Sequence, residues 1–145
     1  MDAYPHHYKV QAAAKTEGSV ALASERLPNL SSAPPAQFGG PGDQWSPETL
    51  LVASAVDCLI LTFRAIARAS KLPWLSLDCN AKGVLDRVEG ITRFTEIRTN
   101  ARLVLPAGAD AEKARRLLEK AEKTCLITCS LKAESKLTTE VEIAT

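Results

Sequence analysis

The longest apolar segment of the chain reads WSPETLLVASAVDCLILTFRAIARAS and covers residues 45–70. It opens with the signals of a helix start. Ser46 can cap the first turn with its hydroxyl, Pro47 suits the first helical position, and Glu48 puts a negative charge in the first turn. The residues that follow are apolar on nearly every side, so a helix here must be buried over most of its surface. We therefore predict a long central helix over residues 47–70.

Five shorter segments have the composition and alternation that are typical of strands. They cover residues 8–14, 19–24, 74–86, 91–105 and 136–144. Asp110 can cap a second helix, whose apolar stripe ends at Cys125 and faces inward. The predicted order ββ, α, ββ, α, β gives an α+β fold. Residues 25–45 are rich in Pro, Gly and Ser, which predicts a loop without regular helix and with little strand pairing.

The composition is that of a globular protein. The 145 residues suit a single domain over residues 1–145, with 46% hydrophobic and 24% charged residues. The formal charge is +1 and the basic residues are scattered, so neither nucleic acid nor an anionic membrane is an expected partner. The N-terminus lacks a secretory signal, and the apolar run is too short and too interrupted to cross a bilayer. We expect a cytoplasmic protein.

The chain has four cysteines, which without a secretory signal points to redox or metal chemistry, or to buried thiols. Compact zinc sites use paired, closely spaced ligands, and only Cys125 and Cys129 form such a pair. We expect neither a metal nor a cofactor. Cys58 and Cys125 lie on inward faces of two helices that must pack together, so their thiols could meet, although each also suits a core position.

The other two cysteines have different settings. Cys79 lies on the inward face of a predicted strand, which is typical of an inert core thiol. Cys129 follows Cys125 by four residues and would share its face if the helix continued. It is either a spare resolving thiol or a packing residue, and packing is favoured.

Two segments resemble the OsmC/Ohr family of hydroperoxide reductases, named for osmotically inducible and organic hydroperoxide resistance proteins. Residues 45–58 are similar to the family pattern of Asn or Ser, Pro and Glu, followed by apolar and small residues and the first redox cysteine. Glu48 and Cys58 fall on the matching positions. Residues 121–128 are similar to the segment that holds the second redox cysteine, which is Cys125 here.

The second segment departs from the pattern in two places. The family usually has Pro, an apolar residue and Ser after the second cysteine. Here Leu126 replaces Pro, and Thr128 replaces Ser.

The resemblance implies antiparallel sheets around a long buried helix, in an intertwined homodimer with two active sites at the subunit interface. It implies a thiol-dependent peroxidase in oxidative stress defence that prefers organic hydroperoxides to hydrogen peroxide. Cys58 would attack the peroxide and Cys125 would resolve the product as a disulfide. A dithiol reductant, lipoyl-type or another thiol, would complete the cycle.

The resemblance also implies an arginine, paired with Glu48, that helps the reactive cysteine. Gln37 stands where the OsmC-type arginine is expected, and the Ohr-type position falls near Lys15. Arg26 is our first candidate for the cation, Lys15 the second and Arg64 the third, although each also suits a solvated surface charge.

The chemistry of Cys58 also makes a nearby arginine or lysine a requirement for fast peroxide reduction. A free cysteine has a pKa near 8.5 and is mostly protonated at neutral pH. Apolar burial and the neighbouring carboxylate of Asp57 would raise the pKa of Cys58 further. Ten helical residues separate Glu48 from Cys58 by about 15 Å. Glu48 therefore serves the other subunit's site, is bent back by a helix break, or only stabilises its own helix start.

Four apolar residues are candidates for a substrate pocket, and each also suits the core: Phe38, Trp45, Leu59 and Phe63. The alternative function is a non-catalytic, dimeric small-ligand binding protein of the same fold, and Gln37 is the feature that favours it. A purely structural module is the third possibility.

Overall fold

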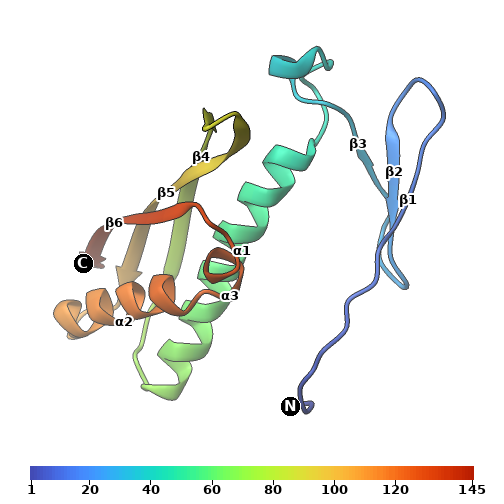
Figure 1. Cartoon of the computed structure of the whole chain (residues 1–145). Coiled ribbons are helices and arrows are strands. Elements are labelled where there is room, and N and C mark those ends of the chain that lie inside the picture. The colour runs from blue at the N-terminus through green and yellow to red at the C-terminus, as the bar shows by residue number, and fades with distance from the viewer. The chain divides into compact units, whose positions relative to one another are not determined.

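The computed structural model covers residues 1–145, which form two compact units, residues 1–50 and residues 51–145 (Figure 1). Unit 1 holds a small antiparallel sheet in the order β1-β2-β3. Its strands are β1 (Gln11–Ala13), β2 (Val20–Ala23) and β3 (Leu30–Ser32), followed by a short 3-10 helix η1 (Ala36–Phe38). The predicted hairpin is confirmed, with shorter strands than expected.

The expectation of little pairing in residues 25–45 was wrong at β3. This strand pairs with β2, with Leu30 opposite Leu22 and Ser32 opposite Val20. The prolines of the segment lie outside β3, at Pro28 before the strand and from Pro34 onward after it. No ladder hydrogen bond is therefore lost within the strand. Pro- and Gly-rich composition therefore limited the length of the strand without preventing it.

The start of the central helix is as predicted. α1 (Pro47–Ala69) begins at Pro47 with Glu48 in its first turn. The Ser46 hydroxyl oxygen accepts a hydrogen bond from the Thr49 N–H at 3.1 Å, and the Thr49 hydroxyl oxygen accepts one from the Ser46 N–H at 2.9 Å. This reciprocal arrangement is a capping box with Thr in the position that Glu or Gln usually takes.

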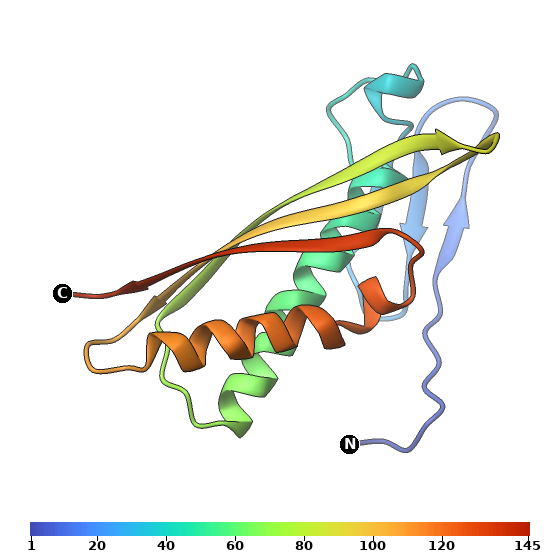
Figure 2. The same ribbon diagram turned by 60° about the vertical axis from the view of Figure 1, so that its left-hand side comes forward.

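Unit 2 contains the larger sheet, ordered β4-β5-β6. β4 (Ser76–Val88) and β5 (Ile91–Leu105) form the predicted long antiparallel hairpin. Glu89 and Gly90 form its turn, and both have positive φ, at 51° and 79°, as a two-residue hairpin requires. β6 (Glu134–Ile143) pairs with β5 in parallel. The connection through α2 (Ala111–Thr124) and the short α3 (Leu126–Cys129) returns the chain along the sheet, so that β6 runs in the same direction as β5 (Figure 2).

The core of unit 2 lies between one face of this sheet and the helices α1 and α2. Every fourth residue of α1 is buried, from Ala55 through Leu59 and Phe63 to Ala67. Leu59, Phe63 and Ala67 belong to one core cluster with buried residues of β5 and α2: Ala101, Leu103, Leu105, Ala114, Leu118 and Ala121. The opposite face of the sheet is polar and carries ion pairs, such as Arg102 with Glu142 at 2.7 Å.

The prediction that α1 is buried on most sides was wrong within one chain. Only one stripe of the helix is buried, and Leu61 is 50% exposed. The physical reason is that unit 2 has a single sheet and one other long helix, which together cover only one side of α1. By length and apolarity α1 would also suffice to cross a membrane, a test that core helices of soluble proteins pass as well.

Cys79 was predicted to face inward on β4, and the alternation of a strand puts Leu75, Leu77 and Ala81 on the same face. The inward face of β4 is half-buried at Leu77, Cys79 and Ala81, as predicted. Leu75 was expected on the same face but is 59% exposed, because β4 begins only at Ser76.

Candidate functional site

Cys58 and Cys125 come together in unit 2, and both are free thiols. Cys58 lies half-buried in the middle of α1, and its sulfur interacts with the thiol of Cys125. Cys125 is only 1% exposed. Its sulfur also lies 3.9 Å from the carbonyl oxygen of Ala55, one turn before Cys58 on α1.

The position of Cys125 follows from the pattern of α2. The apolar stripe of this helix faces the core, so a residue that continues the stripe also points inward. α2 ends at Thr124, and Cys125 has φ −59° and ψ 113°, which is not helical. The chain then starts again as α3, so Cys125 lies at the joint between the two helices.

This joint supplies hydrogen-bond donors to the sulfur of Cys58. The backbone N–H groups of Leu126 and Ile127 both donate to it. They are free to do so because the first N–H groups of a helix have no intrahelical partner. The Thr62 hydroxyl, one turn further along α1, lies 3.7 Å from the same sulfur.

These contacts decide the acidity of Cys58. Burial raises its pKa, but the hydrogen bonds from the Ile127 N–H, the Cys125 thiol, the Thr62 hydroxyl and the Leu126 N–H together lower the pKa below the ordinary value for cysteine. The expectation of a raised pKa was therefore wrong. Burial acts in the expected direction, and four donors that are far from obvious in the sequence outweigh it.

Cys125 has the opposite tendency. Burial raises its pKa, and the neighbouring Cys58 raises it further, although the N–H and hydroxyl of Thr128 act against them. The pair is therefore asymmetric: Cys58 is the more acidic thiol of the two, and Cys125 is the less acidic one.

The remaining two cysteines differ from this pair. Burial, with the charge of Asp78, raises the pKa of Cys79 to about 11, which suits the inert core thiol that was predicted. Cys129 is exposed, and its thiol donates to the carbonyl oxygen of Lys123 at 3.3 Å. The interpretation of Cys129 as a packing residue was wrong, because the chain leaves the core at the Cys125 joint.

Glu48 has an unusual environment. Its side chain is half-buried, and one carboxylate oxygen, Oε1, is buried without a hydrogen-bond partner. α1 runs without interruption from Pro47 to Ala69, so there is no helix break to bend Glu48 back toward Cys58. The separation of about 15 Å along the helix axis therefore stands.

The candidate cations are all exposed. Lys15 and Arg26 belong to unit 1, where Arg26 has a φ of 65° and lies 4.0 Å from Glu25. Gln37 is exposed on η1. Arg64 follows Cys58 by six residues on α1, which places it on another side of the helix. The groups that lower the pKa of Cys58 are backbone, hydroxyl and thiol donors, none of them an arginine or lysine.

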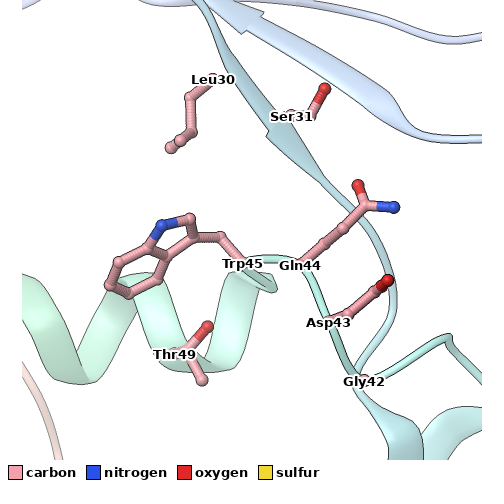
Figure 3. Close-up of a pocket in the computed structure, with 7 residues that line it drawn as sticks. All are labelled: Leu30, Ser31, Gly42, Asp43, Gln44, Trp45 and Thr49. Carbon is pink, nitrogen blue, oxygen red and sulfur yellow. The ribbon is translucent and has the colours of Figure 1, made fainter.

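The four candidate pocket residues are separated by the fold. Leu59 and Phe63 are 4% and 0% exposed in the core of unit 2, so they do not line an open pocket. Phe38 is 60% exposed on η1. Trp45 does line a pocket, an open cavity of about 610 Å³ within unit 1. Figure 3 shows its ring between Leu30 and Thr49, with Gln44 and Asp43 further along the wall.

Sequence reasoning missed the donors around Cys58. Thr62 could have been found, because residues four apart on a helix are neighbours. The Leu126 N–H could also have been suspected, since the proline usual at this position has no N–H to donate. The contact of Ile127 depends on the direction in which α3 starts, and no local pattern gives that direction.

A half-buried cysteine with a lowered pKa on a long helix, beside a fully buried second cysteine, places this α+β chain in the class of dithiol proteins. The model of the family described as OsmC-like protein matches residues 40–140, and the chain belongs to this family. The resemblance found in the sequence is thereby confirmed, and so is the α+β, OsmC-like fold.

One relative is similar in sequence, and two solved structures are similar in fold. An uncharacterised protein from Bacillus subtilis (strain 168), YmaD, is 27% identical over 112 residues, which cover 75% of each chain. The structure of an OsmC-like protein of unknown function from Vibrio cholerae has a TM-score of 0.85 at 16% identity, covering 94% of this chain and 100% of the other. An organic hydroperoxide resistance protein from Elizabethkingia anophelis has a TM-score of 0.76 at 20% identity, with 97% and 99% covered.

Proposed function

We propose that this protein is a thiol-dependent peroxidase that reduces organic hydroperoxides to alcohols through Cys58 and Cys125. The observation that carries the proposal is the asymmetry of this pair. Cys58 has a lowered pKa and is only half-buried, whereas Cys125 beside it is fully buried with a raised pKa. A thiolate is the nucleophilic form of cysteine, and a neighbouring thiol is what a resolving cysteine requires.

The proposed cycle has three steps. The Cys58 thiolate attacks the distal peroxide oxygen, the O–O bond breaks, and the alkoxide takes a proton and leaves as an alcohol. Cys58 is then a sulfenic acid. The Cys125 sulfur attacks it, water leaves, and a Cys58–Cys125 disulfide forms. An external dithiol, lipoyl-type or another, returns both cysteines to thiols and becomes a disulfide itself.

The donors around Cys58 can support this chemistry without an adjacent arginine. N–H groups of Leu126 and Ile127 stabilise a sulfur anion in the same way that backbone amides stabilise an oxyanion. A cation can add to this effect, and Arg26, Lys15 and Arg64 stay candidates for it. The buried, unpartnered oxygen of Glu48 favours a role in which this carboxylate meets a cation in an assembled homodimer.

The family supports a peroxiredoxin-like role at a coarse level, because solved relatives include proteins named for organic hydroperoxide resistance. In this proposal the whole chain acts as one OsmC-like domain. It forms a homodimer in the cytoplasm and takes part in the defence against oxidative stress.

The test is turnover of cumene hydroperoxide, compared with hydrogen peroxide, with dithiothreitol as reductant. We expect wild type to consume the organic peroxide faster, Cys58→Ser to be inactive, and Cys125→Ser to stop at a sulfenic acid that dimedone traps. Cys79→Ser serves as the control, because its thiol is outside the pair. A wild-type rate no higher than that of free thiol would refute the proposal.

The second candidate function is a dimeric small-ligand binding protein without catalysis. It is favoured by Gln37, which replaces the expected arginine, and by the open cavity beside Trp45. Such a protein would bind a small apolar ligand and quench Trp45 fluorescence in a Trp74→Phe background, with no consumption of peroxide. A Trp45→Phe variant, tested by calorimetry, would then bind more weakly.

A further inference from the structure

The proposed cycle leaves Cys129, the exposed cysteine, without a role. It ends α3, one helical turn after Cys125, and its N–H donates to the Cys125 carbonyl at 3.0 Å. Its thiol donates to the carbonyl of Lys123 at 3.3 Å, in the last turn of α2. Side chains on a helix lean toward the N-terminal turn, and this hydrogen bond directs the Cys129 sulfur back toward the joint that holds Cys125.

The exposures of the two thiols are complementary. The sulfur of Cys125 would be inaccessible to an external dithiol, because this residue is 1% exposed. Cys129 lies on the surface only four residues away. A thiol in this position is open to solvent and can approach Cys125 from the side of α3 once the turn between them opens.

We propose that Cys129 is a second resolving thiol, which moves the disulfide from the buried pair to the surface, and this step rests on the function proposed above. The Cys129 thiol loses its proton to solvent, and its thiolate attacks the sulfur of Cys125 in the Cys58–Cys125 disulfide. That bond breaks, Cys58 leaves as a thiolate, and a Cys125–Cys129 disulfide forms with no net change in oxidation state. An external dithiol then reduces the Cys125–Cys129 bond in a two-electron step.

The direction of the exchange follows from the environment of Cys58. In thiol–disulfide exchange the sulfur that better carries negative charge is the better leaving group. The N–H groups of Leu126 and Ile127 and the hydroxyl of Thr62 all donate to the Cys58 sulfur. Attack at Cys125, with departure of Cys58, therefore also returns the nucleophile in its active form.

The exchange requires a local change of structure. Residues one helical turn apart have Cβ atoms about 5–6 Å apart, whereas a disulfide needs about 3.5–4.5 Å. The C-terminal end of α3 must therefore open, which breaks the hydrogen bond from the Cys129 N–H to the Cys125 carbonyl and leaves the Leu126 and Ile127 N–H groups beside Cys58.

The masses of the tryptic peptides distinguish the Cys58–Cys125 disulfide from the Cys125–Cys129 disulfide. Cys125 and Cys129 fall in the same tryptic peptide, TCLITCSLK, residues 124–132, whereas Cys58 lies in residues 27–64. A Cys125–Cys129 bond makes the first peptide lighter by two hydrogen atoms, and a Cys58–Cys125 bond joins the two peptides.

The experiment oxidises the full-length protein with one equivalent of diamide, which makes disulfides without peroxide, and follows both species by mass spectrometry after acid quenching. We expect the joined peptides to give way to the internal disulfide in wild type, and to persist in Cys129→Ser. Reduction by dithiothreitol should be about tenfold slower in Cys129→Ser. Cys79→Ser should behave as wild type.

Equal reduction rates, with no internal disulfide in wild type, would overturn the relay whether or not the peroxidase proposal holds. Peroxide turnover is measured separately on the same samples. Diamide can convert the Cys58–Cys125 disulfide into the Cys125–Cys129 disulfide even if cumene hydroperoxide does not oxidise Cys58. In that case the relay stands and the peroxidase proposal fails.

Discussion

Cys58 shows how hydrogen bonds can reverse the effect of burial on a single residue. Four donors from α1 and from the joint before α3 lower its pKa, although burial alone would raise it. Three of these donors belong to residues 125–127, which are distant from Cys58 in sequence. The acidity of this cysteine is therefore a property of the packed helices.

The first prediction concerns the pH dependence of Cys58. Since only the thiolate reacts, its alkylation rate should rise with pH and level off above its pKa. Because that pKa is lowered, the half-point should lie below that of a free cysteine. The half-point of Cys125 should lie above that of a free cysteine, and the half-point of Cys79 should be near 11. Iodoacetamide labelling, followed peptide by peptide, measures all of these; a Cys58 half-point above that of free cysteine would contradict the structure.

The second prediction concerns the backbone of Leu126. Leu126→Pro removes one N–H donor, and proline is well tolerated at the first position of a helix, so the fold should be kept. We expect the pKa of Cys58 to rise, because one of the donors that lower it is lost. A pH titration of the far-ultraviolet absorbance of the thiolate measures the change.

Leu126→Ala is the matched control, because it shortens the side chain and keeps the N–H. It should leave the pKa of Cys58 close to the wild-type value. An equal shift in both variants would mean that the side chain of Leu126, and not its N–H, is responsible.

At the level of elements, α1 is positioned by its start and by one close approach to the sheet. The Ser46 and Thr49 capping box fixes where the helix begins. Further along, Gly83 of β4 allows Val52 of α1 and Phe94 of β5 to approach the strand backbone closely. α1 and the β4–β5 hairpin can therefore pack closely at Gly83, where β4 has no side chain.

The third prediction tests this approach. A Cβ at Gly83 would lie 2.6 Å from Cγ2 of Val52 and 2.9 Å from Cε1 of Phe94, which is too close for either contact. Gly83→Ala should lower the free energy of unfolding by about 1–3 kcal/mol. Urea denaturation measures this loss. Adding Val52→Ala should recover part of it, and a double variant as unstable as the sum of both single changes would argue against the contact.

At the scale of the whole molecule, a single chain leaves much of α1 uncovered. The helix is apolar nearly all round, yet its buried residues form one stripe, and Leu61 is 50% exposed. Burial of apolar surface is favourable by about 25 cal/mol per Å², so this uncovered side favours a second copy of the chain as its partner. The homodimer remains part of our proposal, and it would also give the unpartnered oxygen of Glu48 a neighbour.

The fourth prediction follows from this uncovered side. Leu61→Asp introduces a charge where the proposed dimer buries apolar surface, so the mass measured by sedimentation or light scattering should shift toward the monomer. Thr92→Asp, at an exposed position of β5, is the control and should leave the mass unchanged. A dimer of undiminished stability in Leu61→Asp would remove α1 from the interface.

The sequence by itself determined the features that depend on local patterns. The start of α1, the β4–β5 hairpin, the cap of α2 and the inward direction of Cys125 all follow from residue type and spacing, and all are confirmed. The motifs around Glu48, Cys58 and Cys125 were also sufficient to indicate the family.

Only the tertiary structure decided the remaining features, because they depend on residues far apart in the chain. These are the pairing of β3, the parallel position of β6, the single buried stripe of α1 and the surface position of Cys129. The lowered pKa of Cys58 belongs to the same group. A pattern of residue types gives the face on which a side chain lies, whereas the donors that meet it are set by how the helices pack.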